Sequence, residues 1–438
     1  MNRNRWWLVA AANLLLGAVA MVMVLLLGEF ALRRGWLGPV RTNAPSPTRG
    51  WTILPNLDFT WQYRGDDGKP VRIRIRTDAN GFRMVHEMRS KQAGLIRIGV
   101  LGDSFTLGAP IPDEQVYPFV LERALASRAA RPVEVVNMGV SAYGVHQEKA
   151  ALEEQGLALH PDVVVVALYL GNDLQETLGL HHKEYHPNTG QLVAVYDHQI
   201  VDGRMVSVPP AQASAGGSPL FRLKRWLGGH SGLYAALVPR IKRSALMRKV
   251  GTTGGLMAQV PARLSPEART LLVWGGDGMA SLLRKVPPAM EDAWEILLRH
   301  LDAMNADCRA HGARFVVVLI PYRIQLVPEE REKLNKLVGL RDADFDLELP
   351  NHRIRAWGEA AGVPVIDLLD DFRRVPDPGS LYFAGDIHWN AKGHVLAGRA
   401  LARALVDRGI VPARESGGRG EPAAFSGSDW RGAGARLE

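Results

Sequence analysis

The sequence predicts an α/β domain built on a parallel, doubly wound sheet. The chain has 438 residues, of which 47% are hydrophobic, so it can bury a sizeable core and is neither a disordered protein nor a small disulfide-rich one. Five apolar runs alternate with helical patterns, an order typical of parallel sheets covered by helices. One run is almost unbroken, as expected for a strand covered on both faces. The predicted strands are 96–101, 133–136, 163–168, 315–320 and 363–368.

The first element along the chain is an apolar segment. Trp6 to Leu27 forms a 22-residue run in which Asn13 is the only polar side chain. As a helix this run would span ~33 Å, enough to cross the hydrocarbon core of a bilayer. A cleaved signal peptide is the competing interpretation, but its apolar region is usually only ~7–15 residues long and ends at a small-residue site. We therefore predict a transmembrane anchor within residues 1–36, and the arginines on its two sides do not decide its orientation.

Residues 37–94 are predicted to be a juxtamembrane segment with a short β element. Within it, 71–76 alternates strictly between apolar residues and arginine, which indicates a strand with one apolar face and one solvated face. The α/β domain follows at 95–412. Its pattern lapses at 175–290, which we interpret as an insertion, and the Gly-, Ala-, Arg- and Ser-rich residues 413–438 are predicted to be a disordered tail.

The positive charge of the chain is concentrated in the insertion. Lys and Arg outnumber Asp and Glu by 53 to 45, a net charge of +8. Residues 203–266 contain ten Lys or Arg and no acidic residue, and subtracting these ten charges leaves −2 for the rest of the chain. No nucleic-acid-binding motif accompanies them, so no nucleic-acid partner is predicted. Two interpretations stay open: a solvated cover for a functional site, or a basic amphipathic surface that contacts anionic lipid or an anionic polymer.

Polar motifs follow four of the five predicted strands. Gly-Asp-Ser ends at Ser104 after the first strand, Gly139 follows the second, and Gly-Asn-Asp with Asn172 follows the third. Asp386 and His388 follow the fifth strand beyond a loop. Each motif alone is also explained by a turn, a helix cap or a packed histidine. Because ligands bind beyond the carboxyl ends of parallel strands, all four together indicate a functional site.

These residue types fit nucleophilic catalysis. A serine hydroxyl attacks only when a base takes its proton, and an imidazole oriented by a carboxylate does so near neutral pH. Asp386 and His388 are two residues apart, and residues i and i+2 of an extended segment project to the same side. The tetrahedral intermediate also needs donors for its oxyanion. A glycine such as Gly139 lets backbone approach closely, and Asn172 supplies an amide donor.

With these motifs, residues 95–410 resemble the GDSL/SGNH family of serine esterases and acyltransferases. The resemblance implies a flavodoxin-like three-layer α/β/α sandwich with about five parallel strands. It also implies that Ser104 is the nucleophile and His388 the base. The oxyanion hole implied by the resemblance consists of the Ser104 amide, the Gly139 amide and the Asn172 side chain.

The position of the acid departs from the usual pattern of that family. The family usually places its acid three residues before the histidine, where this chain has Gly385, whereas Asp386 lies two residues before it. This Asp-x-His spacing resembles the alginate O-acetyltransferase-like branch, and Asp386 is the predicted acid. Asn80-Gly81-Phe82-Arg83 is similar to a membrane-anchored bacterial branch of the family.

Other chemistry-bearing residues receive structural interpretations. Asp103 and Asp173 are expected to be hydrogen-bonding scaffold, His394 to lie on the surface of the last helix, and Cys308 to be a packed thiol. Four potential metal ligands lie in a segment expected to be an irregular loop without helical spacing, so neither a metal site nor a cofactor is predicted. These four are His181, His182, Glu184 and His186.

The sequence therefore predicts a membrane-anchored serine esterase that hydrolyses acetyl or other short-chain acyl esters through an acyl-enzyme on Ser104. One alternative is an O-acyltransferase that modifies a cell-envelope or exported polysaccharide. Another is a non-catalytic cell-envelope binding or assembly protein. The expected partners are an acyl ester, a carbohydrate, and the membrane through residues 6–27 and the basic insertion 203–266. Mainly from the resemblance, we expect a single-pass protein of the inner membrane with its catalytic domain in the periplasm.

Overall fold

The computed structural model contains a five-stranded parallel sheet. Its strands stand in the order β12-β11-β7-β5-β6, and every neighbouring pair is parallel. They are β5 (Ile96–Gly102), β6 (Val133–Asn137), β7 (Val163–Leu168), β11 (Arg314–Leu319) and β12 (Val365–Asp367). The structure describes residues 3–33, 42–46, 48–64, 70–177, 181–185, 192–201, 204–207, 279–286, 288–384 and 386–414.

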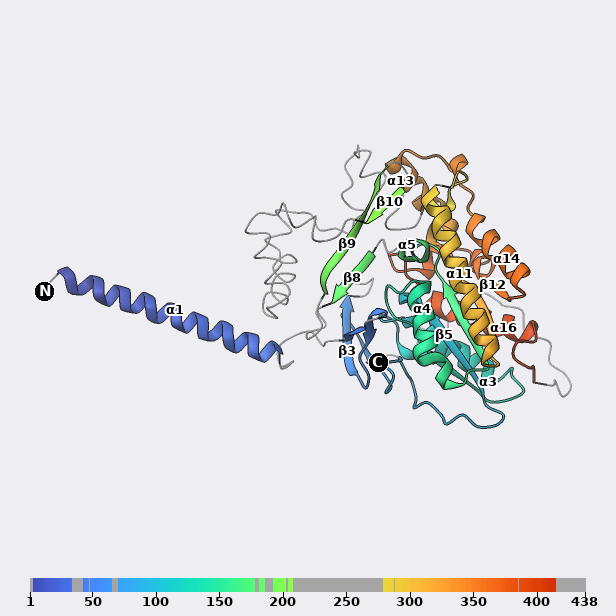
Figure 1. Cartoon of the computed structure of the whole chain (residues 1–438), viewed down its shortest axis with the longest axis horizontal. Helices are drawn as coiled ribbons and strands as arrows, with labels where there is room; N and C mark the ends of the chain where they lie inside the picture. Colours follow the sequence, from blue (N-terminus) through green and yellow to red (C-terminus); the bar gives the residue numbers. More distant parts are fainter. Residues whose placement is uncertain are drawn as a thin grey trace.

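Helices cover both faces of this sheet and complete a three-layer sandwich. On one face α3 (Tyr117–Ala126) packs against α16 (Ala391–Asp407). On the other, α11 (Pro288–Ala310) packs against α4 (Val145–Ala151), and α14 (Leu349–Ala361) is joined to α11 by ion pairing (Figure 1). All six residues of β7 are buried, because the central strand is covered on both sides. The fold class predicted from the sequence is confirmed for the sheet and its helices.

Shorter helices lie at strand ends and in the connecting loops. They are α2 (Ser104–Leu107), α5 (Asp173–Thr177), α12 (Arg323–Leu326), α13 (Pro328–Val338) and α15 (Leu369–Arg373). Single turns of other helical types are η1 (Asp113–Gln115), η2 (Leu152–Gly156), η3 (Leu157–Leu159), η5 (Met279–Leu282), η6 (Asp342–Asp344) and η7 (Pro378–Leu381).

Two antiparallel strand pairs precede the domain. β1 (Asn43–Ser46) pairs with β2 (Gly50–Ile53), and β3 (Asp58–Arg64) pairs with β4 (Pro70–Arg76). In β4 the isoleucines are buried while Arg72 and Arg74 are exposed, so the predicted alternating strand is confirmed. Trp51 in β2 is buried and donates its indole N–H to the carbonyl of Ser141, which ties these strands to the α/β domain.

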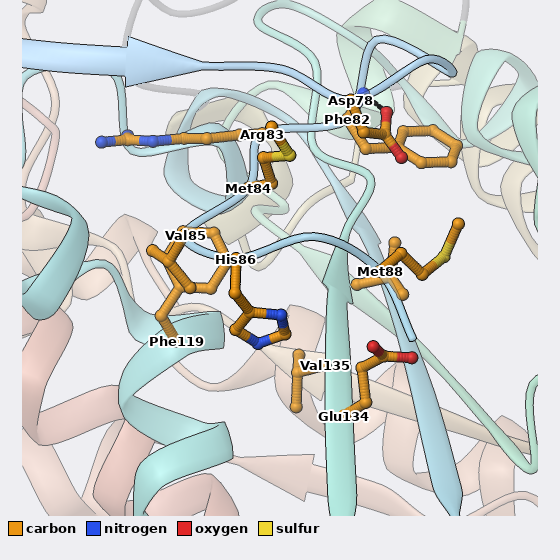
Figure 2. Close-up of a pocket in the computed structure, with 11 residues that line it drawn as sticks. Asp78, Phe82, Arg83, Met84, Val85, His86, Met88, Phe119, Glu134 and Val135 are labelled. Atoms are coloured by element: carbon orange, nitrogen blue, oxygen red, sulfur yellow. Dashed lines mark hydrogen bonds between the residues drawn. The ribbon is translucent and has the colours of Figure 1, made fainter. Parts of the chain in front are cut away.

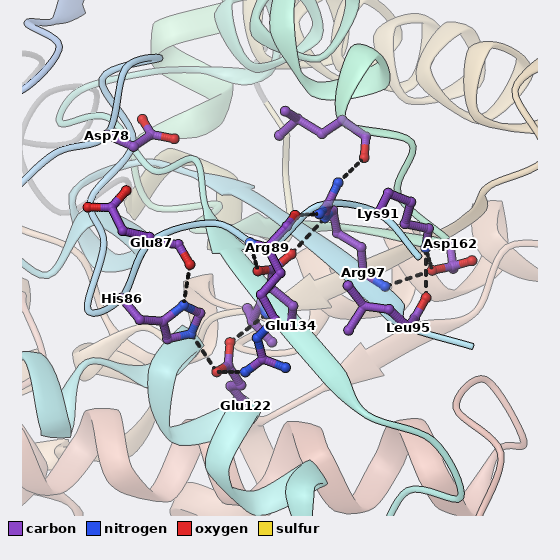
Figure 3. Close-up of polar contacts among 12 residues, drawn as sticks. Asp78, His86, Glu87, Arg89, Lys91, Leu95, Arg97, Glu122, Glu134 and Asp162 are labelled. Carbon is purple, nitrogen blue, oxygen red and sulfur yellow. Dashed lines mark hydrogen bonds and ion pairs between the residues drawn. The ribbon is translucent and has the colours of Figure 1, made fainter. Parts of the chain in front are cut away.

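Residues 77–91 run from β4 along the outer edge of β6. Arg83 forms a β-bridge with Asn137, and the amide of Arg89 donates to Glu134 at 2.6 Å. Nearby, His86 pairs with Glu122 on α3, and Lys91 pairs with Asp162 (Figure 3). We call residues 77–91 the strap. The strap covers the edge of the sheet with side chains and backbone, so that the outer strand is not left open to pairing with another chain.

The N-terminal segment forms one helix, α1 (Arg3–Arg33), which contains the predicted anchor at 6–27. Within the part of the chain that the structure describes, no helix has the length and apolar character needed to cross a membrane. The predicted transmembrane span is therefore not confirmed.

The insertion is described only in part. β8 (His181–Tyr185), β9 (Leu192–Val201) and β10 (Arg204–Ser207) form a three-stranded antiparallel sheet. The expectation of an irregular loop at 181–185 is thus wrong, because strand pairing with β9 satisfies this backbone. Apart from 204–207, the basic stretch 203–266 lies outside the described residues, as do His186 and the tail beyond 414.

Candidate active site

The predicted nucleophile lies where the first strand of the sheet ends. β5 ends at Gly102, and Ser104 begins the single turn α2. The carboxylate of Asp103 accepts a hydrogen bond from the amide of Phe105 at 2.8 Å and so caps this turn. Gly108 ends it in the left-handed conformation, at a φ of 61° that favours glycine. Asp103 therefore has the scaffold role expected for it, as the residue that fixes the start of the turn.

Ser104, His388 and Asp386 form a hydrogen-bonded chain. Ser104 Oγ lies 2.7 Å from Nε2 of His388, and Nδ1 of the same ring lies 2.6 Å from Oδ1 of Asp386. The same Oδ1 also accepts the backbone N–H of His388 at 2.9 Å. The structure thus brings together three residues that the sequence predicts, across 284 positions of the chain. The geometry fits a nucleophile, a base and an orienting acid.

The electrostatic surroundings of His388 favour its role as the group that accepts the proton of Ser104. Burial opposes a charged imidazole, but the hydrogen bond and charge of Asp386 outweigh it, so the pKa of His388 lies above its ordinary 6.5. The hydrogen bond with His388 conversely lowers the pKa of Asp386. Asp386 is therefore ionised at neutral pH, as its role of stabilising a developing imidazolium requires.

The loop that carries Asp386 and His388 is held at both ends. Tyr382 and Trp389 form a β-bridge at its base, and Trp389 is buried beside Phe105. Within the loop, the guanidinium of Arg323 donates to the carbonyls of Phe383 at 2.5 Å and Asp386 at 2.9 Å. Arg323 follows the fourth strand, β11, where no motif was recognised in the sequence. The sequence feature that could indicate a role for Arg323 is its position shortly after the end of a predicted strand.

The predicted oxyanion donors lie at the same edge of the sheet. Gly139 follows β6, and its N–H donates to the side chain of Asn137 at 3.0 Å. Asn172 follows β7, and its Nδ2 donates to Asp103 at 3.1 Å and approaches Glu176 at 3.4 Å. Both groups therefore have intramolecular partners in this structure. An oxyanion hole that includes the Ser104 amide, Gly139 and Asn172 stays a prediction.

Four carboxylates are buried directly behind this rim. Burial raises the pKa of Asp103, and it raises the pKa values of Glu148 and Asp173 well above their ordinary range, with mutual repulsion adding to the effect. Glu176 adds a further negative charge that acts on Glu148 and Asp173. Sequence reasoning identified Asp103 and Asp173 as scaffold but missed the two glutamates, which lie on α4 and α5.

Some predictions about single residues are settled by the packing. His394 is only 2% exposed and stacks on Tyr117, so its predicted surface position is wrong. It is buried because Gly398, one turn further along α16, lets that helix approach α3 closely enough to enclose the ring. Cys308 is a buried thiol, as predicted. In the described ranges no three His, Cys, Asp or Glu residues gather in a metal-binding arrangement.

A small cavity lies under the strap and not beside the hydrogen-bonded residues Ser104, His388 and Asp386. Phe82, Met88, Phe119 and Val135 are among the residues that line it (Figure 2). Its volume of about 20 Å³ leaves room for roughly one water molecule. None of Ser104, Asn172 or His388 borders it, so it is not the substrate site.

Comparison with known proteins identifies the domain type. A family described as SGNH hydrolase-like domain, acetyltransferase AlgX, matches residues 285–425, about a third of the chain. This match contains Asp386 and His388 but not Ser104, which the structure places 2.7 Å from His388. The chain carries an SGNH hydrolase-like domain. The superfamily that the sequence motifs suggested is thereby confirmed.

One curated relative and several solved structures resemble the SGNH-type domain. The probable alginate O-acetylase AlgJ of Pseudomonas aeruginosa is 27% identical over 154 residues, which cover 34% of this chain and 36% of AlgJ. The match thus spans about a third of that relative's length. A lipase/acylhydrolase from Enterococcus faecalis is 13% identical, with 72% of this chain and 96% of that one covered and a TM-score of 0.33. The acetylxylan esterase Axe2 from Geobacillus stearothermophilus is 13% identical, with coverage of 71% and 94% and a TM-score of 0.34.

Proposed function

We propose that this protein is a serine O-acyltransferase that moves an acetyl or other short acyl group onto a hydroxyl of a cell-envelope or exported polysaccharide. The single observation that carries the proposal is the hydrogen-bonded chain Asp386–His388–Ser104. The polysaccharide acceptor is supported by the similarity to AlgX and AlgJ, whose descriptions name acetyl transfer and alginate.

The proposed first half of the reaction uses the contact between Ser104 and His388. Ser104 Oγ attacks the acyl carbonyl carbon while Nε2 of His388 takes the hydroxyl proton across the 2.7 Å contact. The carbonyl π bond becomes the oxyanion, and Asp386 stabilises the imidazolium. When the oxyanion collapses, the bond to the leaving alkoxide breaks and His388 returns the proton to that oxygen. The acyl group is then esterified to Ser104.

The second half repeats these steps with an acceptor. A hydroxyl of the acceptor loses its proton to His388 and attacks the acyl-enzyme, and the proton then returns to Ser104 Oγ. Water in place of the sugar hydroxyl gives hydrolysis by the same steps, so an esterase is the second candidate function. The half-exposed Asp386 and partly exposed His388 leave the base open to either acceptor.

The test separates the two acceptors. The full-length protein is incubated with p-nitrophenyl acetate, with and without alginate oligosaccharides, and the sugars are analysed by mass spectrometry. Acetylated sugar that forms with wild type but not with Ser104→Ala supports acyl transfer. Release of acetate alone would assign hydrolysis, and neither product together with no labelling of Ser104 by a fluorophosphonate would contradict both functions.

We also propose that residues 6–27 anchor the protein in the inner membrane with its catalytic domain in the periplasm. The support is the apolar sequence of α1 and the exposure of its apolar side chains, such as Leu16 at 74% and Leu27 at 65%. Fractionation of cells that express the full chain tests this. The protein should remain with membranes at high pH and should be digested by protease added to spheroplasts, and recovery in the soluble fraction would contradict the proposal.

A further inference from the structure

Arg83 is a buried arginine whose guanidinium is fully used in hydrogen bonds. Its side chain has no exposed surface. Nη1 donates to the carbonyls of Leu107 at 2.9 Å and Gly108 at 2.5 Å. Nη2 donates to the carbonyl of Ile111 and to Asp113, both at 2.7 Å, and Nε donates to Asp113 at 3.0 Å. Asp113 neutralises the charge, which makes burial of the guanidinium tolerable.

The carbonyls that Arg83 binds belong to the end of the nucleophile turn. α2 is four residues long, far below the length at which a helix is stable alone, and its last carbonyls have no partner within the turn. Gly108 N closes the turn onto Ser104 O at 2.9 Å, and Asn137 Nδ2 binds Thr106 O at 2.8 Å. Arg83 satisfies the next two carbonyls. We call this set of guanidinium hydrogen bonds the Arg83 fork. The fork therefore fixes the backbone of α2, which determines where the Ser104 side chain points.

Arg83 is in turn held by a rigid segment of the strap. The carboxylate of Asp78 accepts the amides of Asn80 and Phe82 at 2.9 and 2.8 Å, which closes a tight turn. Gly81 has a φ of 85°, and a Cβ there would lie 2.3 Å from the carbonyl oxygen of Ile53. Figure 2 shows the Asp78–Phe82 contact and the Arg83 side chain extending away from Phe82. The turn thus delivers one arginine into the domain from outside the sheet.

We propose that Arg83 is a positioning residue that aligns Ser104 with His388, which makes the strap part of the catalytic unit. The inference rests on the proposed serine chemistry. The guanidinium touches no reacting atom and acts through the backbone from Leu107 to Ile111. Loss of the fork lets α2 tilt and misplaces Ser104 Oγ, and a misplacement of ~1 Å can lower turnover by ~100-fold.

The chain offers a matched control in Arg97. This arginine is also buried, pairs with one carboxylate, Glu134, at 2.8 Å, and donates to the carbonyls of Leu159 and Arg89 (Figure 3). It lies at the start of β5, and Ser104 follows the other end of that strand. At ~3.3 Å per residue the two are roughly 23 Å apart. Arg97→Lys therefore removes an equivalent buried fork far from the nucleophile.

The experiment compares Arg83→Lys, Arg97→Lys and Ser104→Ala in the full-length protein. For each variant we would measure Tm, kcat and KM for p-nitrophenyl acetate, and the rate of fluorophosphonate labelling. We expect both lysine variants to have a lower Tm than wild type, by similar amounts. Only Arg83→Lys should lower kcat, by ~10- to 100-fold with KM within ~2-fold of wild type, and its labelling should slow in parallel.

The outcomes separate this inference from the proposed function. If Arg83→Lys keeps wild-type kcat while Ser104→Ala abolishes activity, or if Arg97→Lys loses as much kcat, Arg83 is structural and the serine chemistry still stands. If wild type has no activity and no label at Ser104, the proposed function fails and this inference fails with it. If Arg83→Lys does not fold, Asp113→Asn decides: a folded Asp113→Asn protein should show reduced kcat at unchanged KM, and wild-type kcat would overturn the proposal.

Discussion

At the scale of single residues, the two-residue spacing of Asp386 and His388 has a geometric explanation. One oxygen, Oδ1 of Asp386, accepts both the backbone N–H of His388 at 2.9 Å and its ring Nδ1 at 2.6 Å. The chain bends at 386–388 and is not the extended segment expected from the sequence, so the carboxylate two residues before the histidine binds the backbone and the ring at once. The acid thus orients the imidazole and the loop together, with Arg323 fixing the carbonyl of Asp386 from the other side.

The nucleophile gives the first prediction. Ser104→Ala removes the hydroxyl that lies 2.7 Å from Nε2 of His388, so turnover of p-nitrophenyl acetate should fall by roughly 10⁴-fold or more while Tm stays near that of wild type. Peptide mapping after fluorophosphonate treatment checks the assignment directly. Label on another serine, or activity retained in the variant, would show that a different residue attacks.

The acid gives a prediction about pH dependence. Catalysis needs neutral His388, whose pKa lies above 6.5 because Asp386 stabilises the charged ring, so the acidic limb of kcat/KM should lie above pH 6.5 in wild type. Asp386→Asn removes the charge but keeps a hydrogen-bonding oxygen. The limb should move to lower pH and kcat should fall by roughly 10²- to 10⁴-fold, less than in His388→Ala. A rate profile from about pH 5 to pH 9 measures both effects. An unchanged profile would mean that another carboxylate serves His388.

At the scale of elements, the nucleophile turn is packed between its neighbours without spare room. A Cβ at Gly139 would lie 2.4 Å from the amide nitrogen of Leu107 and 2.7 Å from Thr106. The loop after β6 therefore touches α2 backbone to backbone, and Asn137 joins the two by hydrogen bonds to Thr106 and Gly139. The residues that place Ser104 come from three separate elements: the strap, β6 and α2.

This contact predicts the effect of one added methyl group. Gly139→Ala should push α2 away from the loop, lower kcat by at least ~10-fold and lower Tm, because the atoms in the way belong to backbone. Gly156→Ala is the control. Its nearest neighbours are the flexible side-chain ends of Leu152 and Met138, so kcat should be unchanged. Equal activity of Gly139→Ala and wild type would show that the turn tolerates displacement.

The sequence predicts the residues of the site better than the residues that support them. Ser104, Asn172 and His388 follow apolar strands, and parallel topology alone brings strand ends to one edge. Arg83 and Arg323 act through carbonyls more than twenty and more than fifty positions away, and such pairs depend on tertiary packing that has no local pattern. His394 was misplaced for the same reason, since the enclosing contact comes from α3 rather than from its own helix.

At the scale of the whole molecule, the fold buries acidic groups at a cost in stability. Glu148 is 1% exposed, and neither of its carboxylate oxygens has a hydrogen-bond partner among the described residues. Its burial beside Asp103 and Glu176 raises its pKa well above 4.5. A folded state that binds the proton more tightly than the unfolded chain loses stability as the pH rises above the unfolded pKa. The contribution of Glu148 to the free energy of unfolding should therefore be more favourable in mild acid than at pH 8.

Glu148→Gln tests this cost. The variant should unfold at a higher temperature than wild type at pH 8, by ~2–4 °C for each kcal/mol recovered. The gain should shrink as the pH falls and should vanish below the unfolded-state pKa of 4.5, where Glu148 is protonated in both states. Differential scanning fluorimetry at several pH values measures it. Glu153→Gln, at a half-exposed position paired with Lys149, is the control and should leave Tm nearly unchanged. A lower Tm for Glu148→Gln at pH 8 would mean that the charged form is stabilised in the fold.

The separation of Ser104 from His388 has a consequence for the growing chain. The two residues are 284 positions apart, and the last helix, α16, starts only after the histidine. At ~5–20 residues per second, ribosomes need roughly 15–60 s to extend the chain from the serine to the histidine. During that interval the nucleophile has no base, so a nascent or prematurely terminated chain carries an inert serine. The proposed acyl chemistry therefore requires that translation has passed the loop at 382–389 and that β11, β12 and α16 have packed into the domain.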